Sequence, residues 1–182
     1  MYQKLNEEYH DERYNGGFYL SFADLYCEKY LDKDRKLLVI KAGSGGTGFS
    51  DDMWKKGGEP YERMMEMIDM ALSLNKENRI VGLLWHQGEC DVAWGKSSEW
   101  YEHEFIELIS EIRCKYGIFP VLAGDFSKDW ALDKENIKFT VSYSKMFENL
   151  DKKINLYGFV SSENLESNAK AIGNDDAIHF SR

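Results

Sequence analysis

The sequence predicts an α/β fold, a three-layer α/β/α sandwich around a parallel sheet. Short apolar runs alternate along the chain with amphipathic segments of about 12 residues or more, the length that a crossover helix between parallel strands needs. The chain has 182 residues, of which 43% are hydrophobic and 14% aromatic. Such a chain folds around one sizeable core. We therefore expect residues 1–182 to form a single domain.

The first part of the chain predicts one helix, one strand and one long loop. Asn15-Gly16-Gly17 is a turn signal. Residues 18–32 carry apolar side chains near helical spacing and predict a helix. The apolar run Leu37–Ile40 predicts a short buried strand. A glycine-rich loop over residues 43–58 follows it.

The rest of the chain predicts three strands and three helices. Pro60 suits the first turn of a helix, and the apolar residues spaced after it would form the buried face of that helix. A strand, a helix ending before Gly117, a strand, a helix and a strand follow at residues 80–85, 98–115, 118–123, 136–150 and 154–160. The remaining residues read as loops.

The charge and the cysteines exclude several classes of partner and site. A net charge of −9 with a pI near 5.0 repels phosphate backbones, so we expect no nucleic acid partner. The three separated cysteines suggest neither a zinc site nor a disulfide framework, and their odd number favours a reducing compartment. No apolar run reaches the roughly 18 residues of a membrane span, and residues 1–15 do not resemble a signal peptide. The sequence as written predicts a cytoplasmic protein without a membrane partner.

Three polar segments follow predicted strands or close the chain, at Gly43–Trp54, His86–Asp91 and Asp175–His179. Ligands of parallel sheets bind beyond the carboxyl ends of the strands, where two of these segments begin. Asp176 stands three residues before His179, as an acid that orients a general base would. That spacing alone is commoner in pairs of surface residues.

The other two segments offer donors for a developing negative charge. The Gln87 amide can donate to an oxyanion, and Gly88 permits a tight turn. A polar turn with satisfied hydrogen bonds is the simpler alternative. The glycines of residues 43–48 would let backbone N–H groups approach a ligand, or would make a flexible turn. The loop lacks the Lys-Ser or Lys-Thr ending of a P-loop.

Taken together, three sequence blocks resemble the SGNH hydrolase superfamily, which has a flavodoxin-like sandwich. More narrowly, they are similar to its sialate O-acetylesterase and acetylxylan esterase branch, carbohydrate esterase family six. The blocks occur in the family's order, and the likeness extends over nearly the whole chain: GGTGFSDDMW at 45–54, WHQGECD at 85–91 and DAIHF at 176–180.

The resemblance implies a role for each matching residue. His179 would be the general base and Asp176 its orienting acid. Gly46 would be the oxyanion glycine, Gln87 would stand where many relatives have an oxyanion asparagine, and Glu89 would organise the site. The family removes acetyl groups from sugars with a Ser-His-Asp mechanism and without a metal or an organic cofactor. The expected partner is therefore an acetylated carbohydrate.

The nucleophilic serine of the family has no match at its usual place. In relatives it follows the first strand in a Gly-Gln-Ser or Gly-Asp-Ser motif, whereas residues 1–16 contain neither a serine nor a strand-like run. The chain then reads as an incomplete domain lacking the first strand, as a repurposed non-catalytic domain, or as one in which a local serine substitutes. Ser44 is the best substitute, because Ala42-Gly43-Ser44 imitates a nucleophile elbow.

Two functions remain open from the sequence. The first is a carbohydrate O-acetylesterase-like hydrolase. The second is a non-catalytic carbohydrate-binding or interaction domain, in which tryptophans near the motifs stack on sugar rings: Trp54, Trp85, Trp94 and Trp100. A sheet without its first strand would also expose an edge, so a homo-oligomer is expected.

Overall fold

The computed structural model describes residues 18–181, which fall into two compact units divided between Val39 and Ile40. The prediction of a single domain is not tested by this division and stays a prediction. The first unit contains helix α1, Phe18–Lys29, which confirms the predicted helix. The turn predicted at residues 15–17 lies outside the described residues.

The strand predicted at Leu37–Ile40 is wrong. These residues have no regular secondary structure, and the side chains of Leu38 and Val39 are 62% and 40% exposed. A strand is stable only where a neighbouring backbone accepts and donates its hydrogen bonds. Within residues 18–181 no strand pairs with this run, so its apolar composition alone does not make it a strand.

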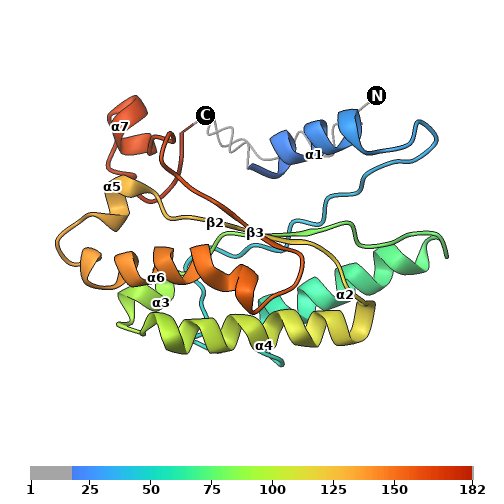
Figure 1. Cartoon of the computed structure of the whole chain (residues 1–182), viewed down its shortest axis with the longest axis horizontal. Coiled ribbons are helices and arrows are strands. Elements are labelled where there is room, and N and C mark those ends of the chain that lie inside the picture. Colours follow the sequence, from blue (N-terminus) through green and yellow to red (C-terminus); the bar gives the residue numbers. More distant parts are fainter. Residues whose placement is uncertain (1–17, 182) are drawn as a thin grey trace. The chain divides into compact units, whose positions relative to one another are not determined.

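A parallel sheet of three strands lies at the centre of the second unit (Figure 1). The strands are β1, Leu83–Trp85, β2, Val121–Gly124, and β3, Tyr157–Val160, hydrogen-bonded in the order β1-β2-β3. Each is shorter than the sequence predicts. The pairing is in register, with Trp85 opposite Ala123 and Ala123 opposite Phe159. The predicted α/β class with a parallel sheet is therefore confirmed.

Three long helices lie together on one side of these strands (Figure 1). They are α2, Glu59–Ser73, α4, Ser98–Tyr116, and α6, Ile137–Asn149, and all three were predicted. The sequence analysis missed the short helices, which are α3 at Glu89–Ala93, α5 at Lys128–Ala131, the 3-10 turn η1 at Leu150–Lys152 and α7 at Asn168–Ile172. Nowhere in residues 18–181 is there a helix with the length and apolar character that crossing a bilayer requires.

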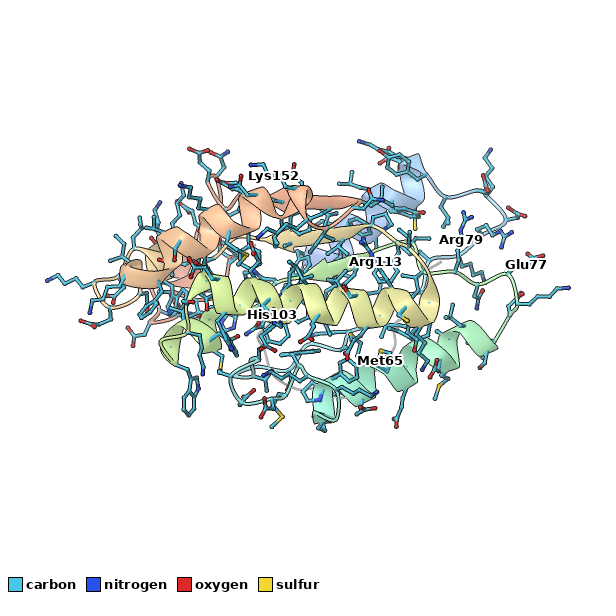
Figure 2. All side chains as sticks on the ribbon, turned by 60° about the horizontal axis from the view of Figure 1, so that its bottom comes forward. Met65, Glu77, Arg79, His103, Arg113 and Lys152 are labelled. Atoms are coloured by element: carbon cyan, nitrogen blue, oxygen red, sulfur yellow. The ribbon has the colours of Figure 1, made fainter. Side chains whose placement is uncertain are left out.

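Helix α4 is fixed at both ends by its own sequence. Ser97 caps its first turn, because the Ser97 side chain accepts a hydrogen bond from Trp100 N at 3.2 Å. At the other end the Arg113 side chain extends from the helix (Figure 2) and donates to the carbonyls of Phe119 and Asn155 at 2.6 and 2.7 Å. These residues precede β2 and β3, so Arg113 ties the helix to the start of both strands.

Aromatic side chains fill the space between the sheet and these helices. Tyr101 of α4 is fully buried and contacts four other buried rings, those of Phe49, Phe105, Tyr143 and Phe147, with centroids 5.1 to 6.3 Å apart. Ring pairs in this range contribute beyond the area that they bury. Because Phe49 belongs to the glycine-rich loop, this cluster also anchors that loop to the core.

Candidate functional site

His179 and Asp176 form a close pair near the end of the chain. His179 Nδ1 lies 2.9 Å from Asp176 Oδ1 and 3.0 Å from Oδ2, and the backbone N–H of His179 donates to the same carboxylate at 3.1 Å. The His179 side chain is 75% exposed. A carboxylate at Nδ1 holds the ring in one orientation and leaves Nε2 to exchange a proton, which is the arrangement of a general base.

The segment that carries this pair is anchored by α7 and the residues around it. Asn168 N donates to the carbonyl of His179 at 2.9 Å, and Asn168 Nδ2 donates to Asp176 Oδ2 at 2.9 Å. Burial opposes ionisation of Asp176, but the hydrogen bonds from Asn168 and His179 outweigh it and hold the pKa of this carboxyl below its ordinary value. Asp176 is therefore ionised near neutral pH and can stabilise a charged imidazole.

The turn after β1 lies beside this segment. Gly88 has φ of +144°, and a Cβ there would lie 2.9 Å from Phe126 Cζ, so only glycine fits. The ring of His86 contacts the ring of Phe180, with centroids 5.6 Å apart. His86 Nε2 lies 3.5 Å from Glu89 Oε1. The structure thus brings the segment of His179 to the carboxyl end of β1.

The glycine-rich loop meets the same turn from the other direction. Gln87 Nε2 donates to the carbonyl of Thr47 at 3.1 Å, and the Cys90 thiol donates to the carbonyl of Gly46 at 3.6 Å. Gly46 has φ of +72°, a conformation that favours glycine. Within residues 18–181, no acceptor pairs with the Gly46 N–H. This N–H is therefore available to a ligand, as an oxyanion donor must be.

Gln87 is more constrained than Gly46. Besides Thr47, its Nε2 donates to Asp91 Oδ2 at 2.8 Å, while its Oε1 accepts from Tyr101 OH at 2.9 Å. Both amide hydrogens thus have acceptors inside the protein. The role of Gln87 as an oxyanion donor stays a prediction, and it requires the release of one of these acceptors.

Two residues of this network were missed by the sequence analysis. Asp91 lies within the quoted block, on helix α3 and four residues after Gln87, which precedes that helix. Tyr101 is fully buried on α4, where it accepts from Trp85 Nε1 at 2.9 Å and donates to Gln87. Nothing in the sequence around Tyr101 distinguishes it from a core tyrosine.

The predicted nucleophile and sugar-stacking residues fall in different environments. Ser44 is half-buried in the glycine-rich loop, and its carbonyl accepts from Thr47 Oγ1 at 2.8 Å. Trp54 and Trp85 are core residues, each 5% exposed, whereas Trp94 is 67% exposed. Trp94 is therefore the more accessible platform for a sugar ring.

The remaining groups near the turn offer little alternative chemistry. Burial, with Asp51 and Asp91 nearby, raises the pKa of the Cys90 thiol. Because the thiolate is the nucleophilic form of cysteine, a raised pKa makes the Cys90 thiol a poor nucleophile. Across residues 18–181, no three histidine, cysteine or acidic side chains stand close enough together to hold a metal ion. The arrangement suits acid–base chemistry on a ligand at the carboxyl ends of the strands.

Comparisons with known proteins identify the family of the chain. A family model described as "Carbohydrate esterase, sialic acid-specific acetylesterase" matches residues 4–182. A protein of Arabidopsis thaliana named as a probable carbohydrate esterase is 28% identical over 94 residues, which make up 52% of this chain. The matched part spans only 35% of the length of that relative.

Proposed function

The chain belongs to the carbohydrate esterase family of sialic acid-specific acetylesterases, and on that premise we propose that it acts on O-acetyl esters of sugars. The observation that carries the proposal is the His179–Asp176 pair, with His179 Nδ1 2.9 Å from the carboxylate and its ring exposed. Sialic acids and acetylated xylans are the substrates that the resemblance suggests. An association into homo-oligomers stays a prediction.

In the proposed reaction His179 acts as the general base. It takes the proton of a serine hydroxyl as the oxygen attacks the acetyl carbonyl, and Asp176 stabilises the imidazolium that forms. The Gly46 N–H donates to the oxyanion of the tetrahedral intermediate. The intermediate expels the sugar oxygen, which receives the proton from His179, and water then releases acetate by the same steps. Glu89, held beside His86, keeps the turn after β1 in place.

Ser44 is the candidate nucleophile to test within the described residues. Its glycine-rich loop meets the turn after β1, through the bonds of Gly46 and Thr47 with Cys90 and Gln87. Its place in the loop that supplies the oxyanion donor argues against it, because a nucleophile and its oxyanion donor must face the carbonyl from different positions. Labelling with a fluorophosphonate, followed by peptide mapping, identifies the serine that reacts.

Hydrolysis of p-nitrophenyl acetate and release of acetate from O-acetylated sugars test the function. His179→Ala should abolish turnover because it removes the base. The matched control is His103→Ala on α4 (Figure 2), since His103 is 71% exposed and lies 3.9 Å from Glu107 one helical turn away. Equal losses in both variants, or unchanged turnover in His179→Ala, would contradict the proposal.

The second candidate function is carbohydrate binding without hydrolysis. The observation that favours it is the exposure of Trp94, 67%, at the end of α3 beside the site. An exposed indole stacks on the apolar face of a sugar ring. Titration of the protein with an O-acetylated sugar, monitored by NMR, distinguishes hydrolysis from binding alone. Binding that depends on Trp94 in a protein that releases no acetate would favour the second function.

A further inference from the structure

Asp91 is a fully buried carboxylate at 0% exposure, and its oxygens hold the glycine-rich loop. Oδ1 accepts from Ser50 N at 2.7 Å, and Oδ2 accepts from Phe49 N at 3.3 Å. Bonds from N–H groups to an ionised carboxylate are about twice as strong as bonds between neutral groups. Gly48 completes the fit, because a Cβ there would lie 2.7 Å from Asp91 Oδ1.

Gln87 joins this carboxylate to the core. Its Nε2 bridges Asp91 Oδ2 and the carbonyl of Thr47, and its Oε1 accepts from Tyr101 OH, which in turn accepts from Trp85 Nε1. The chain of bonds therefore runs from β1 through α4 to the loop. We call Gln87 and Asp91 together the Gln87–Asp91 clamp.

Around Gly46 the carbonyls of the loop are hydrogen-bonded, one of them to Gln87 of the clamp. The carbonyl of Ser44 accepts from Thr47 Oγ1, that of Gly46 accepts from Cys90 Sγ, and that of Thr47 accepts from Gln87. Two of these carbonyls are thus bound to residues after β1, and the third is bound within the loop. The Gly46 N–H, like those of Ser44, Gly45 and Thr47, has no acceptor among residues 18–181. A loop held by its carbonyls presents its N–H groups, the polarity that an oxyanion site needs.

We infer that Asp91 is a positioning residue. Together with Gln87, which is hydrogen-bonded to both Asp91 and Thr47, it holds the glycine-rich loop so that the Gly46 N–H serves as an oxyanion donor. The inference deepens the proposed function and rests on it for the donor role. It also reassigns Gln87. In this view the Gln87 side chain does not touch the substrate, because its two hydrogens are used to hold Thr47 and Asp91.

Amide hydrogen exchange, followed by NMR on the full chain, tests the clamp without any substrate. Asp91→Asn keeps the shape but places an NH₂ group against another donor, either Gln87 Nε2 and the Phe49 N–H at the place of Oδ2 or the Ser50 N–H at the place of Oδ1. We expect these two amides to exchange at least about tenfold faster. The matched control is Asp133→Asn, which removes an exposed carboxylate that accepts from Glu135 N at 3.0 Å. It should leave both amides unchanged.

A double variant that swaps the amide and the carboxylate between positions 87 and 91 tests for rescue. In Gln87→Glu with Asp91→Asn, the new amide at the place of Oδ2 donates to the new carboxylate, the remaining Asn oxygen accepts from Ser50 N, and Tyr101 OH still has an acceptor, whereas Phe49 N and the Thr47 carbonyl lose their partners. Protection of Ser50 should recover at least in part while Phe49 stays exposed to exchange, which a merely space-filling role for Asp91 does not predict. Unchanged exchange in Asp91→Asn, or no recovery in the double variant, would overturn the clamp.

If Asp91→Asn does not fold, amide hydrogen exchange in the natural protein tests the inference instead. Phe49 and Ser50 lie outside every helix and strand, yet the clamp should slow their exchange by about a hundredfold or more relative to an unstructured peptide. Exchange at the unstructured rate would refute the inference.

Kinetics separates this inference from the proposed function. Where acetyl-ester turnover is measurable, Asp91→Asn should lower kcat by about tenfold or more and leave KM within about threefold, because the donor acts on the transition state. An effect on KM alone would overturn the donor role. A further outcome is slowed amide hydrogen exchange at Phe49 and Ser50 in a protein that hydrolyses no acetyl ester. That result would refute the proposed function and the donor role of Gly46, but it would support the clamp.

Discussion

Gly48→Ala places one methyl group where the structure has no room. The added Cβ would lie 2.7 and 2.8 Å from the two oxygens of Asp91 and 2.9 Å from its Cγ. Asp91 is fully buried and is held by Phe49, Ser50 and Gln87, so it has no free direction in which to move. Overpacking of this kind costs about 1–3 kcal/mol, and each bond lost from the carboxylate adds about 1.5–3 kcal/mol.

We therefore expect Gly48→Ala to lower the free energy of unfolding by about 3 kcal/mol, which for a chain of this size lowers Tm by roughly 6–12 °C. Circular dichroism during heating and during urea titration measures both quantities. Gly45→Ala is the matched control in the same loop, because no atom lies within 4 Å of its Cβ position and its φ is not positive. A Tm for Gly48→Ala within about 2 °C of the control would refute the packing of Asp91 against Gly48.

Three further perturbations test other parts of the structure. Tyr101→Phe leaves Trp85 Nε1 without an acceptor and Gln87 Oε1 without a donor. It should lower the free energy of unfolding, measured by urea titration, by about 1–3 kcal/mol, and an unchanged value would argue against these buried hydrogen bonds. Ser97→Ala removes the cap of α4 and should cost about 1 kcal/mol, whereas Ser142→Ala on α6, which bonds only within its own helix, should cost little. The pKa of Asp176 is lower in the folded chain than in the unfolded chain, so its stabilising effect is present above its ordinary value of 3.8 and is lost as pH falls below it. Asp176→Asn should therefore be less stable than the natural protein at about pH 6, the gap should narrow as pH falls below 3.8, and a gap that does not narrow in acid would contradict the assignment.

The long helices were predictable because their signals are local. The spacing of apolar side chains identifies α1, α2 and α4, and the turn at Gly117 defines the end of α4. The run at Leu37–Ile40 has the same apolar composition as true strands but no partner among residues 18–181. Strand formation depends on a neighbouring strand, which in a parallel sheet is distant in sequence, so composition alone does not decide it.

In the candidate site, too, the contacts between residues close in sequence were predictable and those between distant residues were not. The spacing of Asp176 and His179 predicted a contact that the structure contains, because three residues of chain can bring the two side chains together. The engagement of Gln87 was not predictable, since its acceptors and donor come from Thr47, Asp91 and Tyr101, two of which lie far from it in sequence. The roles of these residues in hydrolysis stay predictions.

The sequence by itself determined the family, the α/β class and the positions of the polar segments. These follow from residue type and spacing along the chain, which need no knowledge of distant contacts. Only the tertiary structure decided that Asp91 is buried against the glycine-rich loop, and that Gly46 rather than Gln87 keeps an unused N–H within the described residues. The physical reason is that a hydrogen-bond donor is free or occupied according to which acceptors the fold brings within about 3 Å of it.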